Sequence, residues 1–412
     1  MDKQQINEYM SRDHLADVRR AAEHLQGILL PTNLIHSSFF SSEYNCDVYI
    51  KPENLQRTGS FKLRGAYNKI SNLTDEEKAR GIIAASAGNH AQGCALSARQ
   101  SGVKATIVMP NVTPLLKVDA TKSYGAEVVI AGDVFDEAYD KAVQLSKENG
   151  YTFIHPFDDY DVICGQGTIA LEALTELPDA DEILVPIGGG GLAAGIAMAA
   201  KAIKPDIKVI GIEPQGAMSM KKSLELGHPA TLDALKTCAE GVAVRRPGDL
   251  TFALCREFLD DTITVSEKDI MEAFLLTLEK HKLVAETSGV IPLAAVKKRA
   301  EAGKKIICPI SGGNIDMVTI SSIINQGMIS RGRIMCFSVE LPDKPWQLVK
   351  VSSLLARHDA NVIELQHNQF KAIDRYANKV VLEVTVETNG HQHIQQVLEA
   401  LEDEGFAVKR IY

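Results

Sequence analysis

Residues 182–192, Glu-Ile-Leu-Val-Pro-Ile-Gly-Gly-Gly-Gly-Leu, decide the fold class of this 412-residue chain. The first part, 182–187, is a short apolar run, and residues 193–200 continue with a helical pattern rich in alanine. A buried strand that turns directly into a helix is typical of α/β proteins. A run of glycines loses much conformational entropy on folding, so this turn needs a specific reason to exist.

The turn consists of Gly188, Gly189, Gly190 and Gly191, followed by Leu192. Backbone N–H groups of such a turn, together with the start of a helix, form a site for phosphate. The turn lacks the Lys-Ser/Thr of a nucleotide P-loop and the spacing of a dinucleotide fingerprint, so one small phosphate fits better. The alternative is a glycine-rich turn that serves only close packing.

Further apolar runs, each followed by a turn signal and a helical pattern, extend this organisation along the chain. They occupy residues 81–85, 105–109, 127–130, 208–212 and 305–310. We predict one helix with Thr113 as N-cap and Pro114 as its first residue. We predict another that begins with a capping box at Ser266 and Asp269. The alternation predicts mainly parallel sheets covered on both faces, with ligands at the carboxyl ends of the strands.

Lys62 lies between Phe61 and Leu63, near the start of a helix expected to open at Ser60. Apolar neighbours can desolvate an ammonium group and lower its pKa, as a nucleophilic amine requires. The alternative for Lys62, taken by itself, is a solvated lysine on a helix.

The segment Ser86, Ala87, Gly88, Asn89 and His90 directly follows the run 81–85. Its small residues would let a ligand approach the backbone, and Asn89 is expected to open the next helix with its amide facing the ligand. The alternative is a strand–helix turn capped by Asn89 or Ser86, with His90 as a structural histidine.

Ser311 follows the run 305–310, where its hydroxyl group could meet a ring nitrogen. The alternative is a loop with a helix N-cap. All these segments lie at the ends of predicted strands, and together they supply a lysine, an asparagine, a phosphate turn and a serine. This set can hold pyridoxal 5′-phosphate, and its joint occurrence is more informative than any member alone.

Composition excludes several classes of function. The formal net charge of -9 disfavours nucleic acid as a partner. The sequence has no long apolar run of the kind that forms a signal peptide or a membrane span, so we expect no membrane partner. Seven scattered cysteines without a CxxC pair favour reduced thiols, each expected to be buried, in a cytoplasmic protein.

The last eighty or so residues differ from the rest of the chain. Here the pattern predicts strands at 334–341, 361–370, 378–387 and 406–411, with helices from about Pro345 and at 391–404. This βαββαβ order is the ferredoxin-like arrangement. We therefore predict a catalytic domain at 1–325, with a smaller subdomain at roughly 50–155, and a regulatory domain at 331–412.

The four segments resemble those of the fold-type II pyridoxal-phosphate enzymes, and among them the threonine dehydratase (threonine ammonia-lyase) family. The resemblance extends over roughly residues 15–325, and the lysine and Ser86-Ala-Gly-Asn-His-Ala-Gln-Gly motifs are specific. It implies two open, twisted, mainly parallel sheets and deamination of L-threonine to 2-oxobutanoate and ammonia, with L-serine as a secondary substrate giving pyruvate.

The resemblance also implies residue roles. Lys62 would bind the cofactor aldehyde and later remove the α-proton, Phe61 would pack against the ring, and Asn89 would bond the ring hydroxyl. The phosphate would lie in the turn Gly188, Gly189, Gly190, Gly191 and Leu192, and Ser311 would contact the ring nitrogen. The substrate carboxylate would bind the backbone of Ser86, Ala87, Gly88 and His90.

Two positions depart from relatives of this fold. Serine racemases carry a second serine where this chain has Ala87, so we expect little racemisation. Glu213 matches a family cation site, but Ser219 stands where a second carboxylate is expected, and no metal is assigned. Glu213 alone would be a surface strand end.

Three alternatives for the function remain. They are a serine dehydratase or racemase, a β-replacing synthase, and a catalytically dead regulatory protein.

The C-terminal residues resemble an ACT domain, on the motif Pro342-Asp343-Lys344-Pro345 and the strand that begins at Asn361. This implies an amino-acid or nucleotide effector and a homodimer or homotetramer. Trp346 departs from the pattern, because the family usually has glycine beside this proline. A role in oligomerisation alone is therefore the alternative.

Overall fold

The computed structural model describes residues 3–368 and 379–412. The chain divides into two compact units, Met1–Ile315 and Asp316–Tyr412. The predicted boundary lay between residues 325 and 331, whereas helix α15 (Met317–Ser330) belongs as a whole to the second unit.

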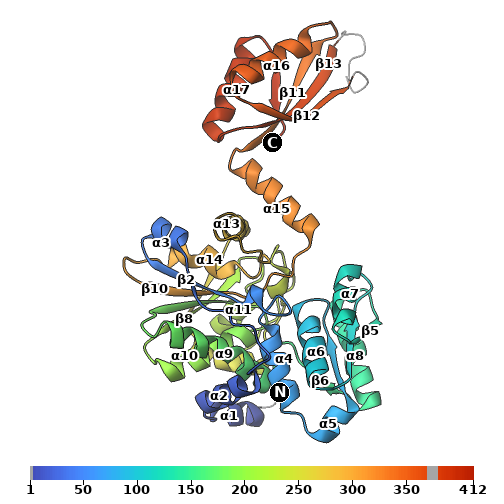
Figure 1. Cartoon of the computed structure of the whole chain (residues 1–412), viewed down its shortest axis with the longest axis vertical. Coiled ribbons are helices and arrows are strands. Elements are labelled where there is room, and N and C mark those ends of the chain that lie inside the picture. Colours follow the sequence, from blue (N-terminus) through green and yellow to red (C-terminus); the bar gives the residue numbers. More distant parts are fainter. Residues whose placement is uncertain (1–2, 369–378) are drawn as a thin grey trace. The chain divides into compact units, whose positions relative to one another are not determined.

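The larger sheet of the first unit has the strand order β1-β2-β10-β7-β8-β9, and only β1 runs antiparallel to its neighbour. Its strands are β1 (Ile35–His36), β2 (Asp47–Pro52), β7 (Glu182–Pro186), β8 (Lys208–Pro214), β9 (Asp261–Val265) and β10 (Lys305–Ile310). All residues of β7 are buried, as expected for a central parallel strand covered on both faces. In Figure 1, α10 and α14 lie on opposite sides of this sheet.

A smaller, all-parallel sheet has the order β5-β4-β3-β6. Its strands are β3 (Ile82–Ala85), β4 (Ala105–Met109), β5 (Glu127–Ile130) and β6 (Thr152–Phe153). Both sheets are mainly parallel and covered by helices, which confirms the predicted fold class of the first unit.

Fourteen α-helices and four short helical turns complete the described part of the first unit, residues 3–315. The helices are α1 (Lys3–Met10), α2 (His14–His24), α3 (Ser38–Tyr44), α4 (Lys62–Ser71), α5 (Asp75–Arg80), α6 (Asn89–Gln100), α7 (Leu115–Ser123), α8 (Phe135–Asn149), α9 (Tyr160–Glu176), α10 (Gly191–Ile203), α11 (Ser219–Leu226), α12 (Asp249–Phe258), α13 (Glu267–Leu276) and α14 (Ile291–Ala295). The short turns are η1 (Glu53–Leu55), η2 (Glu240–Val242), η3 (Thr277–His281) and η4 (Val296–Lys298).

Two predicted helix starts have different outcomes. The capping box at Ser266 and Asp269 is confirmed at the start of α13. The prediction of Thr113 as N-cap is wrong, because α7 begins at Leu115 and Pro114 occupies the cap position with ψ of 137°. Pro114 is extended rather than helical, so the proline precedes the helix instead of forming its first residue.

A cluster of buried charges anchors the start of α4. The fully buried guanidinium of Arg64 donates from Nε to Glu53 Oε2 at 2.7 Å and from Nη1 to Glu172 Oε1 at 2.6 Å. Lys51, also buried, donates to Glu172 Oε2 at 2.6 Å. Buried charges are tolerated when they are paired and hydrogen-bonded, so this cluster fixes α4 against α9 and the end of β2.

The second unit follows the predicted βαββαβ order after α15. Its elements are β11 (Ile334–Pro342), α16 (Gln347–Arg357), β12 (Asn361–Asn368), β13 (Lys379–Glu387), α17 (His391–Asp403) and β14 (Val408–Arg410). The antiparallel strand order β12-β13-β11-β14 is the ferredoxin-like one. The predicted strand ends at 369–370 and 378 lie outside the described residues.

Trp346 immediately precedes α16 with φ of +76°. This left-handed region favours glycine, because a side chain there meets the backbone. The side chain of Trp346 is 74% exposed, so burial does not compensate for this conformation.

All seven cysteines are free thiols, but the expectation that each is buried is wrong for Cys238, which is exposed. None of the helices within residues 3–368 and 379–412 combines the length and apolar character needed to cross a membrane.

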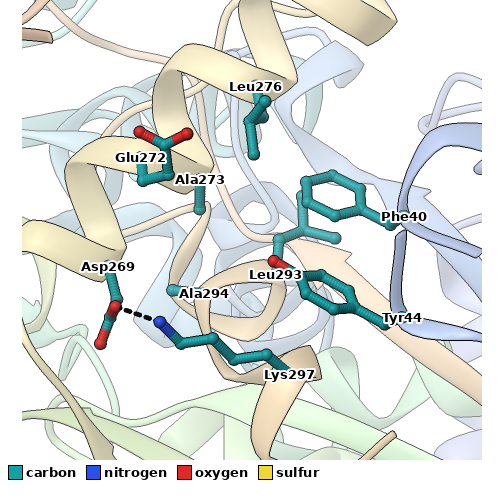
Figure 2. Close-up of a pocket in the computed structure, with 9 residues that line it drawn as sticks. All are labelled: Phe40, Tyr44, Asp269, Glu272, Ala273, Leu276, Leu293, Ala294 and Lys297. Atoms are coloured by element: carbon teal, nitrogen blue, oxygen red, sulfur yellow. Dashed lines mark hydrogen bonds and ion pairs between the residues drawn. The ribbon is translucent and has the colours of Figure 1, made fainter. Parts of the chain in front are cut away.

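A small cavity of about 30 Å³ lies beside α3, α13 and α14. Figure 2 shows Lys297 paired with Asp269 at its edge, with Phe40 and Tyr44 from α3 on another side. None of the residues predicted to bind cofactor or substrate lines this cavity, so it is separate from the site described next.

Candidate active site

Lys62 is the first residue of α4, and its side chain is partly buried. The amine Nζ donates a hydrogen bond to the backbone oxygen of Pro156 at 2.7 Å and lies 5.2 Å from the centre of the Phe61 ring. Burial lowers the pKa of Lys62 to about 8, although Cys94 and Glu286 oppose the shift. A lowered pKa gives the amine a much larger neutral, nucleophilic fraction near neutral pH.

The segment after β3 forms the turn into α6. The hydroxyl oxygen of Ser86 accepts a hydrogen bond from the Gly88 N–H at 3.2 Å, and α6 begins at Asn89, as predicted. In the part of the chain that the structure describes, no side chain caps the N-terminus of α6. The first N–H groups of a helix have no intrahelical partner, so this turn offers donors to an anionic ligand. Ala87 adds no titratable group.

The side chain of His90 has a structural role. The ring is buried, and its Nε2 lies 2.9 Å from the backbone oxygen of Ile154. Burial, with the nearby amine of Lys62, lowers the pKa of His90 to about 3. The ring is therefore neutral, and the alternative of a structural histidine holds for it; only its backbone N–H can serve a ligand.

Asn89 belongs to a polar network that the sequence analysis missed. Its Nδ2 donates to Glu286 Oε1 at 2.9 Å, and its Oδ1 accepts from Asn314 Nδ2 at 2.7 Å. Burial raises the pKa of Glu286. Asn314 and Glu286 gave no local signal for these contacts, because both are far from Asn89 in sequence.

Ser311 is buried at the end of β10. Its backbone oxygen accepts the Phe61 N–H at 3.0 Å, and Gly312 forms an antiparallel bridge with Ser60. These backbone contacts hold Ser311 directly beside the residue that precedes Lys62.

The glycine turn joins β7 to α10, which begins at Gly191. A Cβ atom on Gly189 would lie 2.3 Å from the ring of Phe157, and one on Gly191 would lie 2.9 Å from the Phe157 Cα. Gly190 has φ of +98°. Close packing therefore requires glycine at these positions, as the alternative interpretation held.

The same turn also leaves donors for a ligand. Among the described residues no side chain caps the N-terminus of α10, so its first N–H groups, which have no intrahelical partner, remain available to a ligand. A Cβ on Gly188 would lie 2.9 Å from the Val242 Cα, and Leu192 is buried behind the turn. The turn thus combines tight packing on one side with uncapped donors, which fits a phosphate group.

Pro156 and Phe157 connect the two halves of the site. The backbone oxygen of Pro156 accepts a hydrogen bond from the Lys62 amine, and the neighbouring Phe157 packs against Gly189 and Gly191. These contacts link the Lys62 amine to the glycine turn through two consecutive residues.

The interpretation of Glu213 as a surface strand end is wrong. Glu213 is fully buried and accepts the N–H groups of Met220 at 2.9 Å and Lys221 at 2.8 Å, so it caps α11. Burial raises the pKa of Glu213 to about 7. Among the described residues, no group of three or more His, Cys, Asp or Glu side chains could hold a metal ion.

A lysine amine of lowered pKa and two helix starts without side-chain caps are chemically suited to an aldehyde that carries a phosphate group. Residues 25–312 match the family described as pyridoxal-phosphate dependent enzymes. The chain belongs to this family, and its cofactor is pyridoxal 5′-phosphate.

Full-length relatives have a narrower description. The L-threonine ammonia-lyase of Thermotoga maritima is 42% identical over 96% of this chain and 98% of its own length. The protein of the same name from Geobacter sulfurreducens is 44% identical over 95% and 98%. Processed threonine deaminase isoform 2 from Solanum lycopersicum superposes with a TM-score of 0.75 at 38% identity, over 80% of this chain and 90% of that chain. Maize serine racemase gives 0.72 at 34% identity, over 77% and 98%.

Proposed function

We propose that this chain converts L-threonine to 2-oxobutanoate and ammonia, and L-serine to pyruvate and ammonia, in a catalytic domain formed by the first unit. The observation that carries the proposal is the amine of Lys62, whose pKa is lowered to about 8. This amine donates to Pro156, and the next residue, Phe157, packs against the glycine turn. The relatives named L-threonine ammonia-lyase support this choice of substrate.

Each group of the site has an expected task. The uncapped N–H groups from Gly188 to Leu192 would bind the phosphate, Asn89 the ring hydroxyl, and Ser311 the ring nitrogen. When bound, the cofactor supplies an electron sink for the carbanion formed at the substrate α-carbon. Lys62 Nζ, neutral once substrate has displaced it, would remove the α-proton, because an amine of lowered pKa can act as a base near neutral pH.

The substrate carboxylate would bind the turn from Ser86 to His90 through the N–H groups at the start of α6 and that of Ala87. The N–H of Ser86 already donates to the Val108 oxygen at 3.1 Å, and that of Gly88 donates to the Ser86 hydroxyl. The partly buried Phe157 and the buried Phe61 would limit access of water to the ring. Loss of the β-hydroxyl group, followed by hydrolysis, balances the reaction, because the water lost in the first step is regained when ammonia is released.

The proposal is tested by the spectrum of the purified protein and by ammonia release from L-threonine without any second nucleophile. Lys62→Ala should abolish both the visible absorbance and the ammonia. Lys69→Ala is the matched control in the same helix, since Lys69 pairs with Asp159 and Asp161 instead of facing the site. A Lys62→Ala protein that still releases ammonia at the wild-type rate would contradict the proposal, and a requirement for a second nucleophile would favour a β-replacing synthase.

Serine racemisation is the second candidate activity, because a serine racemase is among the similar structures. Ala87 has no hydroxyl group that could deliver a proton to the opposite face of the substrate. Deamination is therefore the activity that this site supports best.

We further propose that the second unit is an ACT regulatory domain that binds an amino-acid or nucleotide effector and joins subunits into a homodimer or homotetramer. A cavity of about 340 Å³ is lined by residues 341–348 with His367 and Val380, and Trp346 forms part of its wall. Trp346→Ala should change the response of ammonia release to the effector while leaving the rate without effector unchanged. No response to any common amino acid or adenine nucleotide would leave only the role in assembly, which light scattering measures.

The proposal includes a cytoplasmic location. Seven free thiols fit a reducing compartment, where disulfides do not persist.

A further inference from the structure

The connection from β6 to α9 leads from the smaller sheet to a helix that packs against the start of α4. It carries the sequence His155-Pro156-Phe157-Asp158-Asp159. Pro156 and Phe157 contact Lys62 and the glycine turn, as described above. The next residue, Asp158, has no part in the roles assigned so far.

Asp158 holds the start of α12. Its Oδ1 accepts the N–H groups of Leu250 at 3.0 Å and Thr251 at 3.1 Å, and its Oδ2 accepts the N–H of Asp249 at 3.1 Å. A carboxylate on the first N–H groups of a helix satisfies donors that would otherwise lack partners and interacts favourably with the helix dipole. The fit is close, because a Cβ on Gly248 would lie 2.2 Å from the carboxyl carbon of Asp158.

The start of α12 in turn holds the glycine turn. Thr251 Oγ1 donates to the Gly189 oxygen at 2.7 Å, and the Gly248 N–H reaches the same oxygen at 3.4 Å. A Cβ on Gly190 would lie 2.8 Å from the Thr251 Cβ, so Thr251 also limits where the turn can lie. Asp158 therefore reaches the phosphate turn through one intermediate residue.

His155 keeps this connection in shape. Its Nδ1 accepts the N–H groups of Phe157 at 3.3 Å and Asp158 at 2.8 Å, and its ring meets the Phe157 ring edge-on at 4.7 Å. A nitrogen that accepts hydrogen bonds carries no proton, so the ring is neutral with its proton on Nε2. The backbone on either side of Phe157 is thereby fixed.

We propose that Asp158 is a positioning residue for cofactor phosphate: through α12 and Thr251 it fixes the backbone of Gly189 and Gly190 in the conformation that binds the phosphate. The inference rests on the proposed function, because it assumes that the phosphate occupies the glycine turn. It predicts that Asp158 matters for a ligand that carries a phosphate and not for the aldehyde alone.

The test compares pyridoxal 5′-phosphate with pyridoxal, which lacks the phosphate, in absorbance titrations of the cofactor-free protein. Asp158 accepts backbone N–H groups with both carboxylate oxygens, unlike Asp159. Asp158→Asn is nearly isosteric, but it removes the negative charge from the start of α12 and places an amide N–H against the N–H of Asp249 or against those of Leu250 and Thr251, which should displace the start of the helix. We expect the affinity for pyridoxal 5′-phosphate to fall about 10- to 100-fold, the loss typical when a residue that orients ligand-binding groups is changed. The affinity for pyridoxal should change by no more than about twofold, within ordinary variation between variants.

Asp159→Asn is the matched control. Asp159 caps α9 by accepting the N–H groups of Asp161 at 3.0 Å and Val162 at 3.2 Å through one oxygen, which asparagine retains. This variant should bind pyridoxal 5′-phosphate like the wild type. A thermal shift of the cofactor-free protein with inorganic phosphate gives a second readout, which Asp158→Asn should lose and Lys62→Ala should keep.

The outcomes separate failure of the positioning role of Asp158 from failure of the proposed function. Equal losses for pyridoxal 5′-phosphate and pyridoxal in Asp158→Asn would show a general structural role and overturn the inference, as would unchanged affinity for both. A wild-type protein that binds neither compound would instead overturn the proposed function.

Discussion

Raising the pH from about 6 to about 10 should change how fast the cofactor-free protein binds pyridoxal 5′-phosphate, because only the neutral amine of Lys62 can attack the aldehyde. Burial of Lys62 lowers its pKa from 10.5 to about 8. The rate should therefore rise about tenfold per pH unit below this pKa and level off above it.

The size of the effect follows from the two pKa values. At pH 7 about one-tenth of an amine with a pKa of 8 is neutral, against about 0.03% of an ordinary lysine. Lys62 should therefore react about 300-fold faster at pH 7 than an exposed lysine of the same intrinsic nucleophilicity. The gain has a cost in stability, since a shift of this size corresponds to about 3 kcal/mol in the cofactor-free protein.

The sign of that cost determines its pH window. Between pH 8 and 10.5 the unfolded chain holds the Lys62 proton and the folded chain does not, so stability rises with pH across this window. Lys62→Met removes the cost but also the hydrogen bond to Pro156, which contributes about 1 kcal/mol. We expect the variant to be about 2 kcal/mol more stable than the wild type at pH 7, with the difference shrinking as the pH approaches 10.5.

Stopped-flow absorbance measures the binding rate, and urea denaturation of the cofactor-free proteins measures stability. Lys69→Ala serves as the control for the binding rate, because Lys69 pairs with Asp159 and Asp161 away from the site. A binding rate that keeps rising to pH 10, or a Lys62→Met protein less stable than the wild type at pH 7, would refute the argument that burial lowers the pKa of this amine.

Three further outcomes follow. Gly189→Ala places a methyl group against the Phe157 ring; it should cost about 1–3 kcal/mol in urea denaturation and weaken pyridoxal 5′-phosphate binding, and normal binding would contradict the close packing described. Arg64→Ala leaves the buried Glu53 unpaired and should lower the free energy of unfolding by about 3–5 kcal/mol, whereas a loss below 1 kcal/mol would show that the cluster is dispensable. The wild type, with Ala87, should form D-serine about 100-fold more slowly than pyruvate from L-serine, measured by chiral chromatography; comparable rates would reverse the choice between lyase and racemase.

Local sequence predicted the elements that local interactions determine. The runs at 105–109, 127–130 and 305–310 coincide with β4, β5 and β10, because each is a short apolar segment bounded by turn residues. The start of α7 was misplaced by one residue, since Pro114 fixes φ but leaves ψ free to be extended.

Local motifs predicted only part of the site, because several of its contacts join residues that are far apart in the sequence. Lys62 and the glycine turn stand out in local motifs, but Glu286 reaches Asn89 across the fold, and nothing near it in sequence indicates this contact. The acceptor for Lys62 is a backbone oxygen of Pro156, which side-chain patterns do not report. Asp158 acts on backbone N–H groups of a helix that follows much later in the chain.

The single tryptophan of the chain, Trp346, lies in the second unit. Its intrinsic fluorescence therefore reports on that unit alone, while visible absorbance of bound cofactor reports on the other. Recording both signals during one denaturation would show whether the two units melt together or separately, without any label. Coincident curves would mean that the ferredoxin-like unit and the lysine-bearing unit stabilise each other.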